Sequence, residues 1–187
     1  RLMLQNSIHH IPMVDDEGIV LGLHCINDFV NLKKPDVAMV ILAGGKGTRL
    51  RPLTEHLPKP LLKLGSMPMI DRIIIKARTS GIENLFVSLG YLAQKIEQHL
   101  GDGERYGVSI RYIREDEPMG TAGPLGLLVN DCSAEHIIVT NGDVMTDLAY
   151  SDLLSYHLEE GACMTVGLRS HEIQIPFGVV ETERKRV

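Results

Sequence analysis

The chain has no tryptophan among its 187 residues, and it holds only five tyrosines and three phenylalanines. Its hydrophobic core must therefore be built from aliphatic side chains and methionine. No apolar run approaches the roughly 20 residues that a membrane-spanning helix needs, and no signal peptide is visible. We expect a protein with no membrane partner that works in the cytoplasm.

The chain also lacks an excess of positive charge. Its net charge is −5 and no basic stripe runs along any segment, which argues against nucleic acid as a partner. Any anion-binding site must therefore be local. The three cysteines, Cys25, Cys132 and Cys163, form no C-x-x-C pair and indicate free thiols in a reducing compartment.

The first of two regions, residues 1–34, is too small to fold alone. Residues 11–14 and 19–23 read as two strands joined by an Asp-Asp-Glu-Gly turn, and residues 27–32 favour a helix. A hairpin of this size has too few apolar residues for a core of its own. Since Lys33, Lys34, Pro35 and Asp36 resemble a linker, we expect a domain boundary at residues 34–35.

The second region, residues 35–187, alternates strands and helices. Apolar runs predict strands at 37–43, 84–89, 109–114, 136–140, 162–168 and 177–182. Helical spacing and stop signals predict helices at 69–79, 91–100, 121–129 and 150–160. Such alternation is typical of an α/β fold with a doubly wound, mostly parallel sheet, in which ligands bind at the carboxyl ends of the strands.

The most informative segment, residues 43–60, directly follows the first predicted strand of this region. It combines three glycines with Arg49, Arg51 and Lys59, so backbone N–H groups and cations can gather around an anion. Its spacing fits neither a P-loop nor the dinucleotide-binding fingerprint. We interpret it as a cradle for a polyphosphate, the alternative being a turn with solvated charges.

A second polar segment, Asn141-Gly142-Asp143, also follows an apolar strand and should open onto the same sheet edge. Asp143 can either bind a metal ion or serve as a turn or cap residue, which is the commoner role of aspartate after a strand. The histidines show no H-x-x-x-H pair, so a zinc site is not expected.

Residues 43–54 and 58–60 together resemble the signature of sugar-phosphate nucleotidylyltransferases. The similarity continues in order through residues 81–82, 90–91, 101–103, 117–125, 141–143 and 177–180, and it most resembles the mannose-1-phosphate guanylyltransferases. The resemblance implies a Rossmann-like nucleotide-diphospho-sugar transferase fold. It also implies transfer of a nucleoside monophosphate from a nucleoside triphosphate to a sugar 1-phosphate, with release of pyrophosphate.

The resemblance assigns roles residue by residue. Arg49, Lys59 and Asp143 would be catalytic, and Asp143 would bind Mg²⁺. Asn141 and Gly178 would contact the sugar. The nucleotide-binding residues would be Ala43, Gly44, Gly45, Gly47, Thr48, Glu115, Gly120 and Thr121.

Glu115 bears on the choice of base, because it lies where many relatives carry glutamine. A carboxylate only accepts hydrogen bonds, so it suits the N1–H and N2–H₂ donors of guanine, whereas an amide suits thymine or uracil better. We therefore expect GTP to be preferred. The alternative is that Glu115 belongs to a solvated acidic loop.

The first region resembles the C-terminal tail of a CBS module, through residues 11–15 and the pattern Gly22-Leu23-x-Cys25-x-x-Asp28. In such modules Asp28 would bind a ribose, although Cys25 replaces a commoner hydroxyl residue. A single partial module cannot form the usual paired site, so we expect residues 1–34 to be a structural remnant.

The chain begins at Arg1 and ends at Val187, before the Glu-Lys-Pro segment and the second metal carboxylate of similar enzymes. We therefore expect a fragment that is truncated at its C-terminus and impaired on its own. Two other functions stay open: a non-catalytic nucleotide or sugar-nucleotide sensor, and a CBS-type adenine-nucleotide regulatory module. The oligomeric state is equally open, a homo-oligomer included.

Overall fold

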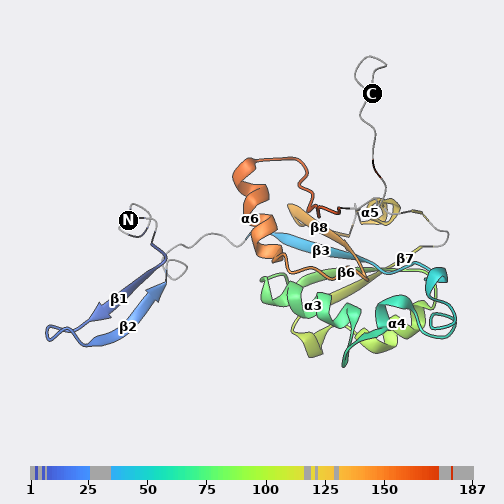
Figure 1. Ribbon diagram of the computed structural model, residues 1–187, viewed down its shortest axis with the longest axis horizontal. Coiled ribbons are helices and arrows are strands. Elements are labelled where there is room, and N and C mark those ends of the chain that lie inside the picture. Colours follow the sequence, from blue (N-terminus) through green and yellow to red (C-terminus); the bar gives the residue numbers. More distant parts are fainter. Residues whose placement is uncertain are drawn as a thin grey trace, which may run out of the picture. The chain divides into compact units, whose positions relative to one another are not determined.

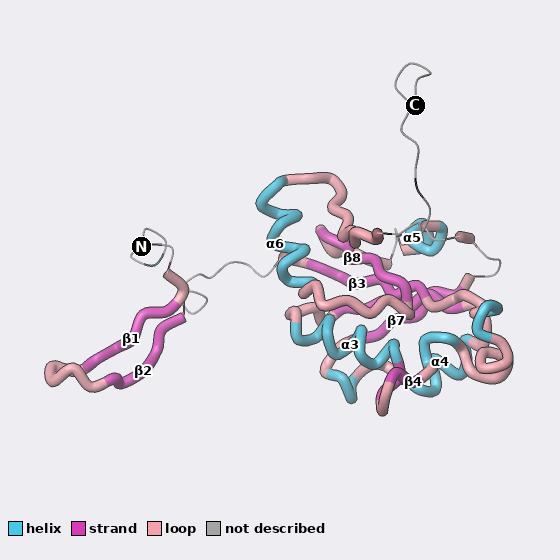
Figure 2. The backbone as a smooth tube through the Cα atoms, in the orientation of Figure 1, coloured by secondary structure: helices cyan, strands magenta, loops and turns pink. Residues whose placement is uncertain are grey.

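A computed structural model describes residues 3, 6, 8–25, 35–115, 119–120, 122–128, 131–172 and 178 (Figures 1 and 2). The chain divides into two compact units, Arg1–Asp147 and Leu148–Val187. Among the described residues, no helix is long and apolar enough to cross a membrane.

The first unit is built on a four-stranded parallel sheet. Its strands are β3 (Val37–Leu42), β6 (Asn84–Leu89), β7 (Ser109–Arg114) and β8 (His136–Asn141), in the spatial order β7-β6-β3-β8. All three neighbouring pairs are parallel. The order and the alternation with helices confirm the predicted doubly wound α/β fold.

Helices cover the two faces of this sheet. Helices α3 (Met69–Thr79) and α4 (Ala93–Leu100) lie on one side, and α5 (Gly123–Leu127) lies on the other (Figure 1). The buried positions of α3 are spaced three and four residues apart, as the sequence predicts. They are Ile70, Ile73, Ile74 and Ala77.

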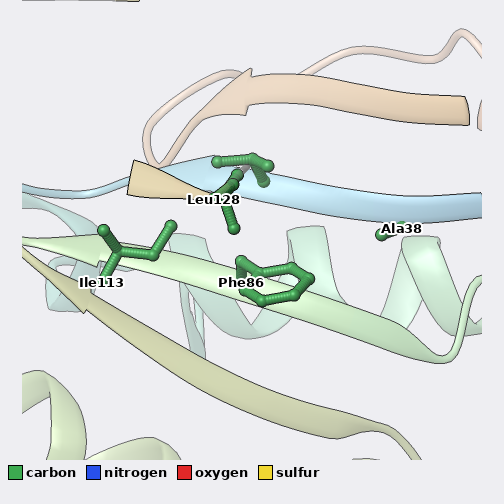
Figure 3. Close-up of a cluster of buried hydrophobic side chains, with 5 residues drawn as sticks. Ala38, Phe86, Ile113 and Leu128 are labelled. Atoms are coloured by element: carbon green, nitrogen blue, oxygen red, sulfur yellow. The ribbon is translucent and has the colours of Figure 1, made fainter. Parts of the chain in front are cut away.

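The core on the α5 side gathers side chains from three strands around Leu128, which directly follows α5. Figure 3 shows Ala38 of β3, Phe86 of β6 and Ile113 of β7 grouped with Leu128. Successive strand residues face opposite sides, so Met39 and Ile41, both fully buried, face the side of α3 and α4. A sheet covered on both faces explains the continuous apolar run of β3.

The boundaries of most elements match the sequence prediction, but several short elements were missed. These are the single-turn helices η1 (Thr48–Leu50), η2 (Lys59–Leu61) and η3 (Glu104–Tyr106), and the strand pair β4 (Lys63–Leu64) and β5 (Met67–Pro68). They are too short to show a periodic apolar pattern. Helix α5 is shorter than the predicted range 121–129 and has Pro124 in its first turn, as expected.

The N-terminal residues form the predicted hairpin, with β1 (His10–Val14) antiparallel to β2 (Val20–Cys25). Its turn is held by the Asp15 carboxylate, which accepts hydrogen bonds from the backbone N–H groups of Glu17 at 3.0 Å and Ile19 at 2.8 Å. Gly18 has a φ of +84°, in the region that favours glycine. The helix predicted at 27–32 lies outside the described residues.

The second unit contains α6 (Tyr150–Glu160), which ends at Gly161 in the left-handed conformation, with a φ of +58°. The strand predicted at 162–168 is wrong, because these residues are described and join no strand ladder. Their alternating apolar side chains stay exposed, Leu168 at 91%. The strand predicted at 177–182 lies outside the described residues, apart from Gly178.

Candidate functional site

The site lies where the order of the strands reverses. From β3 the chain passes through α3 to β6 on one side, whereas β8 pairs with β3 on the other side. In sheets of this kind, the crevice between two such strands at their carboxyl ends is the usual ligand site. The structure has a cavity of about 880 Å³ at this edge.

The residues that line the cavity come from segments far apart in the sequence. They are Leu42, Ala43, Gly44, Gly45, Lys46, Gly47, Thr48, Arg49, Leu50, Lys59, Pro60, Gly90, Tyr91, Glu115, Gly120, Pro124, Asn141, Gly142 and Asp143. The structure thus brings together nearly all of the residues that the sequence singled out. The exceptions are Thr121, which lies outside the described residues, and Gly178, which belongs to the second unit.

The loop after β3 that carries Gly44, Gly45 and Gly47, called the glycine loop below, is fixed at Gly47, which enters η1 in the left-handed conformation with a φ of +61°. A Cβ atom here would lie 3.0 Å from Cγ2 of Thr54, a fully buried side chain whose hydroxyl donates to the Gly47 carbonyl at 2.8 Å. Thr54 therefore anchors the turn that presents Thr48 and Arg49 to the cavity. No local sequence pattern indicates this hydrogen bond, because it joins residues seven positions apart through a turn.

The same loop is held to the end of β6 at Gly44. The Gly44 carbonyl accepts a hydrogen bond from the Tyr91 backbone at 3.1 Å, and a Cβ atom on Gly90 would lie 2.7 Å from that carbonyl oxygen. This close approach of two backbones requires a glycine at position 90, whereas a Cβ atom on Gly44 would instead lie too close to the Glu115 side chain. Gly45, in contrast, has open space where a Cβ atom would stand, which leaves room for a ligand beside its backbone.

Lys59 and Asp143, separated by 84 residues, form an ion pair at the cavity. Lys59 opens η2 between the buried residues Pro58 and Pro60. Asp143 follows Gly142, whose backbone N–H donates to the Leu42 carbonyl at 2.8 Å and which leaves little space against Pro60. The stiff η2 segment and the turn after β8 therefore bring the two charges together, and both side chains stay about one third exposed, 35% and 30%.

The carboxylate of Glu115 is held at both of its oxygens. The Ser88 hydroxyl of β6 donates to Oε1, and the Met119 backbone N–H donates to Oε2 at 3.2 Å. A Cβ atom on Gly44 would lie 2.9 Å from Oε1, so the carboxylate stands beside the glycine loop. Sequence reasoning singled out Glu115 but missed Ser88, which looks like one small residue inside an apolar strand.

Asp143 is the side chain in the cavity that the sequence predicts as a ligand for Mg²⁺. Among the residues that the structure describes, no cluster of three or more His, Cys, Asp or Glu side chains could hold a metal on its own. Mg²⁺ is usually bound by one or two carboxylates together with substrate phosphates and water. Asp143, next to an anion cradle, fits that second type of site.

The chain can now be compared with known proteins. Residues 38–187 match the family model described as "Nucleotidyl transferase". The chain is 34% identical over 149 residues to a mannose-1-phosphate guanylyltransferase of Mycobacterium tuberculosis and 38% identical over 150 residues to a mannose-1-phosphate guanyltransferase of Candida albicans. These matches cover 80% and 78% of this chain, and 42% and 41% of the relatives.

Among solved structures, the chain resembles HddC from Yersinia pseudotuberculosis complexed with GMP-PN, with a TM-score of 0.58 and 30% sequence identity. The match covers 65% of this chain and 54% of the HddC chain. The chain spans about two fifths of the length of the two curated guanylyltransferases named above. With a family model that matches four fifths of its residues, the chain belongs to the nucleotidyl transferase family, and within it to the sugar-phosphate nucleotidylyltransferases.

Proposed function

We propose that the protein transfers a nucleoside monophosphate, preferably from GTP, to a sugar 1-phosphate and releases pyrophosphate. The observation that carries this proposal is the meeting of Lys59 and Asp143 at a cavity that also holds the glycine loop and Arg49. One cavity thus combines cations for phosphate groups with a carboxylate for a metal ion. The guanylyltransferase names of the relatives support the same activity.

The chemistry asks little of the protein beyond positioning and charge. An oxygen of the sugar phosphate attacks the α-phosphorus of the triphosphate, a new P–O bond forms, and pyrophosphate leaves with the electron pair of the broken bond. The attacking phosphate is largely ionised at neutral pH, since the second pKa of such a group is about 6. No general base is therefore required, and catalysis rests on alignment and charge neutralisation.

Each side chain has a defined task in this scheme. Arg49 and the glycine backbone would bind the β- and γ-phosphates, which become the leaving group. Lys59 would align the attacking phosphate and offset its repulsion from the α-phosphate. Asp143 would hold Mg²⁺, which supplies charge neutralisation at the phosphoryl oxygens. Lys59 and Asp143 form an ion pair in the structure, so binding of substrates would exchange this ion pair for two new ones.

Glu115 would read the base. Its carboxylate lies beside Gly44, and therefore next to the segment that would bind the phosphates. A bound nucleotide can place its base against Glu115 and its phosphates on the glycine loop within the same cavity. The acceptor-only carboxylate favours guanine, as argued from the sequence.

The proposal is tested with the full-length protein, because this chain spans only about two fifths of its curated relatives. Pyrophosphate release is measured for a matrix of nucleoside triphosphates and sugar 1-phosphates. We expect turnover with GTP and at least one sugar phosphate in the presence of Mg²⁺. Lys59→Ala and Asp143→Ala should each lower turnover by about 100-fold or more, because each removes a charge that acts at the reacting phosphates.

Two exposed residues outside the cavity provide matched controls. Lys63→Ala and Asp147→Ala remove the same charges and should leave turnover within about twofold of the starting protein, as expected for surface substitutions. Near-normal turnover of the Lys59 and Asp143 variants would contradict the role assignments. Tight GTP binding without pyrophosphate release from any pair of substrates would indicate a sensor instead.

We also propose that residues 1–34 are part of a CBS-type module, as their sequence resemblance suggests. The hairpin supports this, because the consecutive residues Val20 and Leu21 face opposite sides and are 65% and 67% exposed. A two-stranded hairpin with uncovered apolar side chains on both faces is marginal alone. Because a partial module cannot form the paired site, the test is calorimetric titration with AMP of a longer chain that includes a whole module. Binding that Asp28→Ala abolishes would support the idea, and absence of binding to that longer chain would contradict it.

We also propose a cellular compartment, two substrates and a cofactor for this protein. Cys132 and Cys163 are free thiols, which supports a reducing compartment such as the cytoplasm. The partners of the cavity would be a nucleoside triphosphate and a sugar 1-phosphate, and its cofactor Mg²⁺.

A further inference from the structure

We propose that the Ser88 hydroxyl is a positioning residue for base selection: it holds the Glu115 carboxylate in the orientation that accepts both donors of guanine. This inference rests on the proposed function, since it assumes that a nucleotide occupies the cavity. It adds a residue that does not line the cavity itself and that the sequence did not single out.

The first observation is the burial of Ser88. Strand β6 reads Asn-Leu-Phe-Val-Ser-Leu, and every residue from Leu85 to Leu89 is buried, with Ser88 at 0% exposure. A buried hydroxyl without a partner is costly. Ser88 satisfies its hydroxyl by donating to Oε1 of Glu115, 27 residues later in the sequence.

The second observation is the number of ties on Glu115. Its backbone N–H donates to the Leu89 carbonyl at 3.1 Å, which extends the β6–β7 ladder by one hydrogen bond. Its Oε1 accepts from Ser88 and its Oε2 accepts from the Met119 backbone. A carboxylate offers about four lone-pair sites, so two remain for a ligand, and the two that are used prevent the group from turning freely.

The third observation places this fixed carboxylate in the cavity. Gly44 has no side chain, and a Cβ atom there would lie 2.9 Å from Oε1. Glu115 lines the cavity, whereas Ser88 stands behind it, opposite Leu42 of β3 and Ile113 of β7 in the sheet register. The Glu115 carboxylate is therefore hydrogen-bonded to a residue of the rigid sheet, Ser88 of β6.

The chemistry of the bases gives this arrangement a measurable consequence. Guanine presents N1–H and N2–H₂ side by side, which a fixed carboxylate can accept together. Hypoxanthine, the base of ITP, has N1–H but lacks the exocyclic amine, so it can make only one of the two hydrogen bonds. The ratio of the dissociation constants of ITP and GTP therefore reports how well Glu115 is oriented, largely independently of the phosphates that both nucleotides share.

The test is calorimetric titration of the protein and its Ser88→Ala variant with GTP, ITP and inorganic pyrophosphate. We expect GTP to bind about tenfold more weakly to the variant, in line with the loss of a hydrogen bond to a charged group. Binding of ITP should weaken less than binding of GTP, so the ratio of the ITP and GTP dissociation constants should fall. The dissociation constant of pyrophosphate should stay the same. Thermal unfolding of each variant shows whether the fold is retained.

A double-mutant cycle separates positioning from a merely structural role. Glu115→Gln should lower the ITP/GTP ratio by itself, and adding Ser88→Ala should lower it no further, because Ser88 acts through Glu115. The variant Ser88→Thr keeps the hydroxyl and should restore most of the ratio. If Ser88→Ala does not fold, the size-matched Ser88→Cys, a weaker donor, takes its place and should lower the ratio to an intermediate value.

The outcomes for this inference and for the proposed function are distinct. A protein that binds GTP and transfers its GMP group to the sugar phosphate with release of pyrophosphate, but whose ITP/GTP ratio is unchanged in the Ser88 variants, overturns the inference and leaves the proposed function intact. A folded protein that binds no nucleoside triphosphate overturns both.

Discussion

At the scale of single residues, the site is defined by close contacts that few side chains would allow. Gly44 and Gly90 bring two backbone segments together, Gly47 adopts a left-handed conformation, and Gly45 faces open space. The glycines therefore serve two purposes. Gly44, Gly47 and Gly90 shape the backbone around the cavity, and Gly45 leaves room for a ligand.

Gly90→Ala provides a test of the close approach. The new Cβ atom would lie 2.7 Å from the Gly44 carbonyl oxygen, a backbone atom that cannot move aside as a flexible side chain can. We expect the free energy of unfolding to fall by about 1–3 kcal/mol, the usual cost of overpacking. Urea denaturation measures this change.

The matched control is Gly126→Ala in α5, where a Cβ atom meets nothing within 4 Å. Its free energy of unfolding should stay equal or rise slightly, because alanine favours a helix over glycine. Equal stability of Gly90→Ala and the starting protein would show that the two backbone segments can separate at no cost.

At the scale of elements, sequence periodicity predicted the parts that carry a repeated apolar pattern. The bounds of α3, α6, β6 and β7 agree with the sequence prediction to the residue. In the helices the apolar residues are spaced three and four positions apart, and in the strands they alternate or form a short continuous run, so each pattern is typical of one type of element. The location of residues 43–60 and 141–143 at the carboxyl ends of the strands followed from the same reasoning, because both segments come directly after buried strands, whereas the strand order that makes this edge a switch point was not predicted.

The side-chain tie at Glu115 was missed because it depends on a contact between segments that are distant in sequence. The hydrogen bond from Ser88 to Glu115 arises from the register of β6 against β7, which no local pattern specifies.

The opposite error, a strand predicted where none forms, occurred at residues 162–168. Their alternation is strand-like, but a strand also needs a partner for its backbone groups, and the described residues offer none to this segment.

At the scale of the whole molecule, the order β7-β6-β3-β8 explains why one edge collects the chemistry. All four strands run in the same direction, so their carboxyl ends deliver residues 43–47, 90, 115 and 141–143 to one side of the sheet. The opposite edge receives the other ends of the strands and none of the predicted site residues that the structure describes in the first unit.

The stability of the folded chain should also depend on pH in the alkaline range, through Tyr106 and Tyr112. Burial raises the pKa of each phenol to about 12, from the ordinary 10.0. For Tyr106 a hydrogen bond from Arg105 opposes the effect of burial and the charge of Asp71 adds to it, and for Tyr112 the charges of Glu97 and Asp102 add to it.

The sign of the effect follows from proton binding. Between about pH 10 and 12 the unfolded chain releases these two phenolic protons while the folded chain keeps them, so the free energy of unfolding falls as the pH rises through this window. Below about pH 10 both states hold the protons and the two tyrosines add no pH dependence. The tyrosinate absorbance, followed with and without urea, should show two groups that ionise later in the folded chain.

Lysines also titrate in this range, so a variant without the two phenols isolates their contribution. The double variant Tyr106→Phe, Tyr112→Phe should show a shallower decline of the unfolding free energy between about pH 10 and 12 than the starting protein. Its absolute stability will differ, because the Tyr112 hydroxyl donates to the Gly101 carbonyl and that hydrogen bond is lost. The slope is therefore the relevant quantity, and identical slopes would contradict the assignment of the two late-titrating groups.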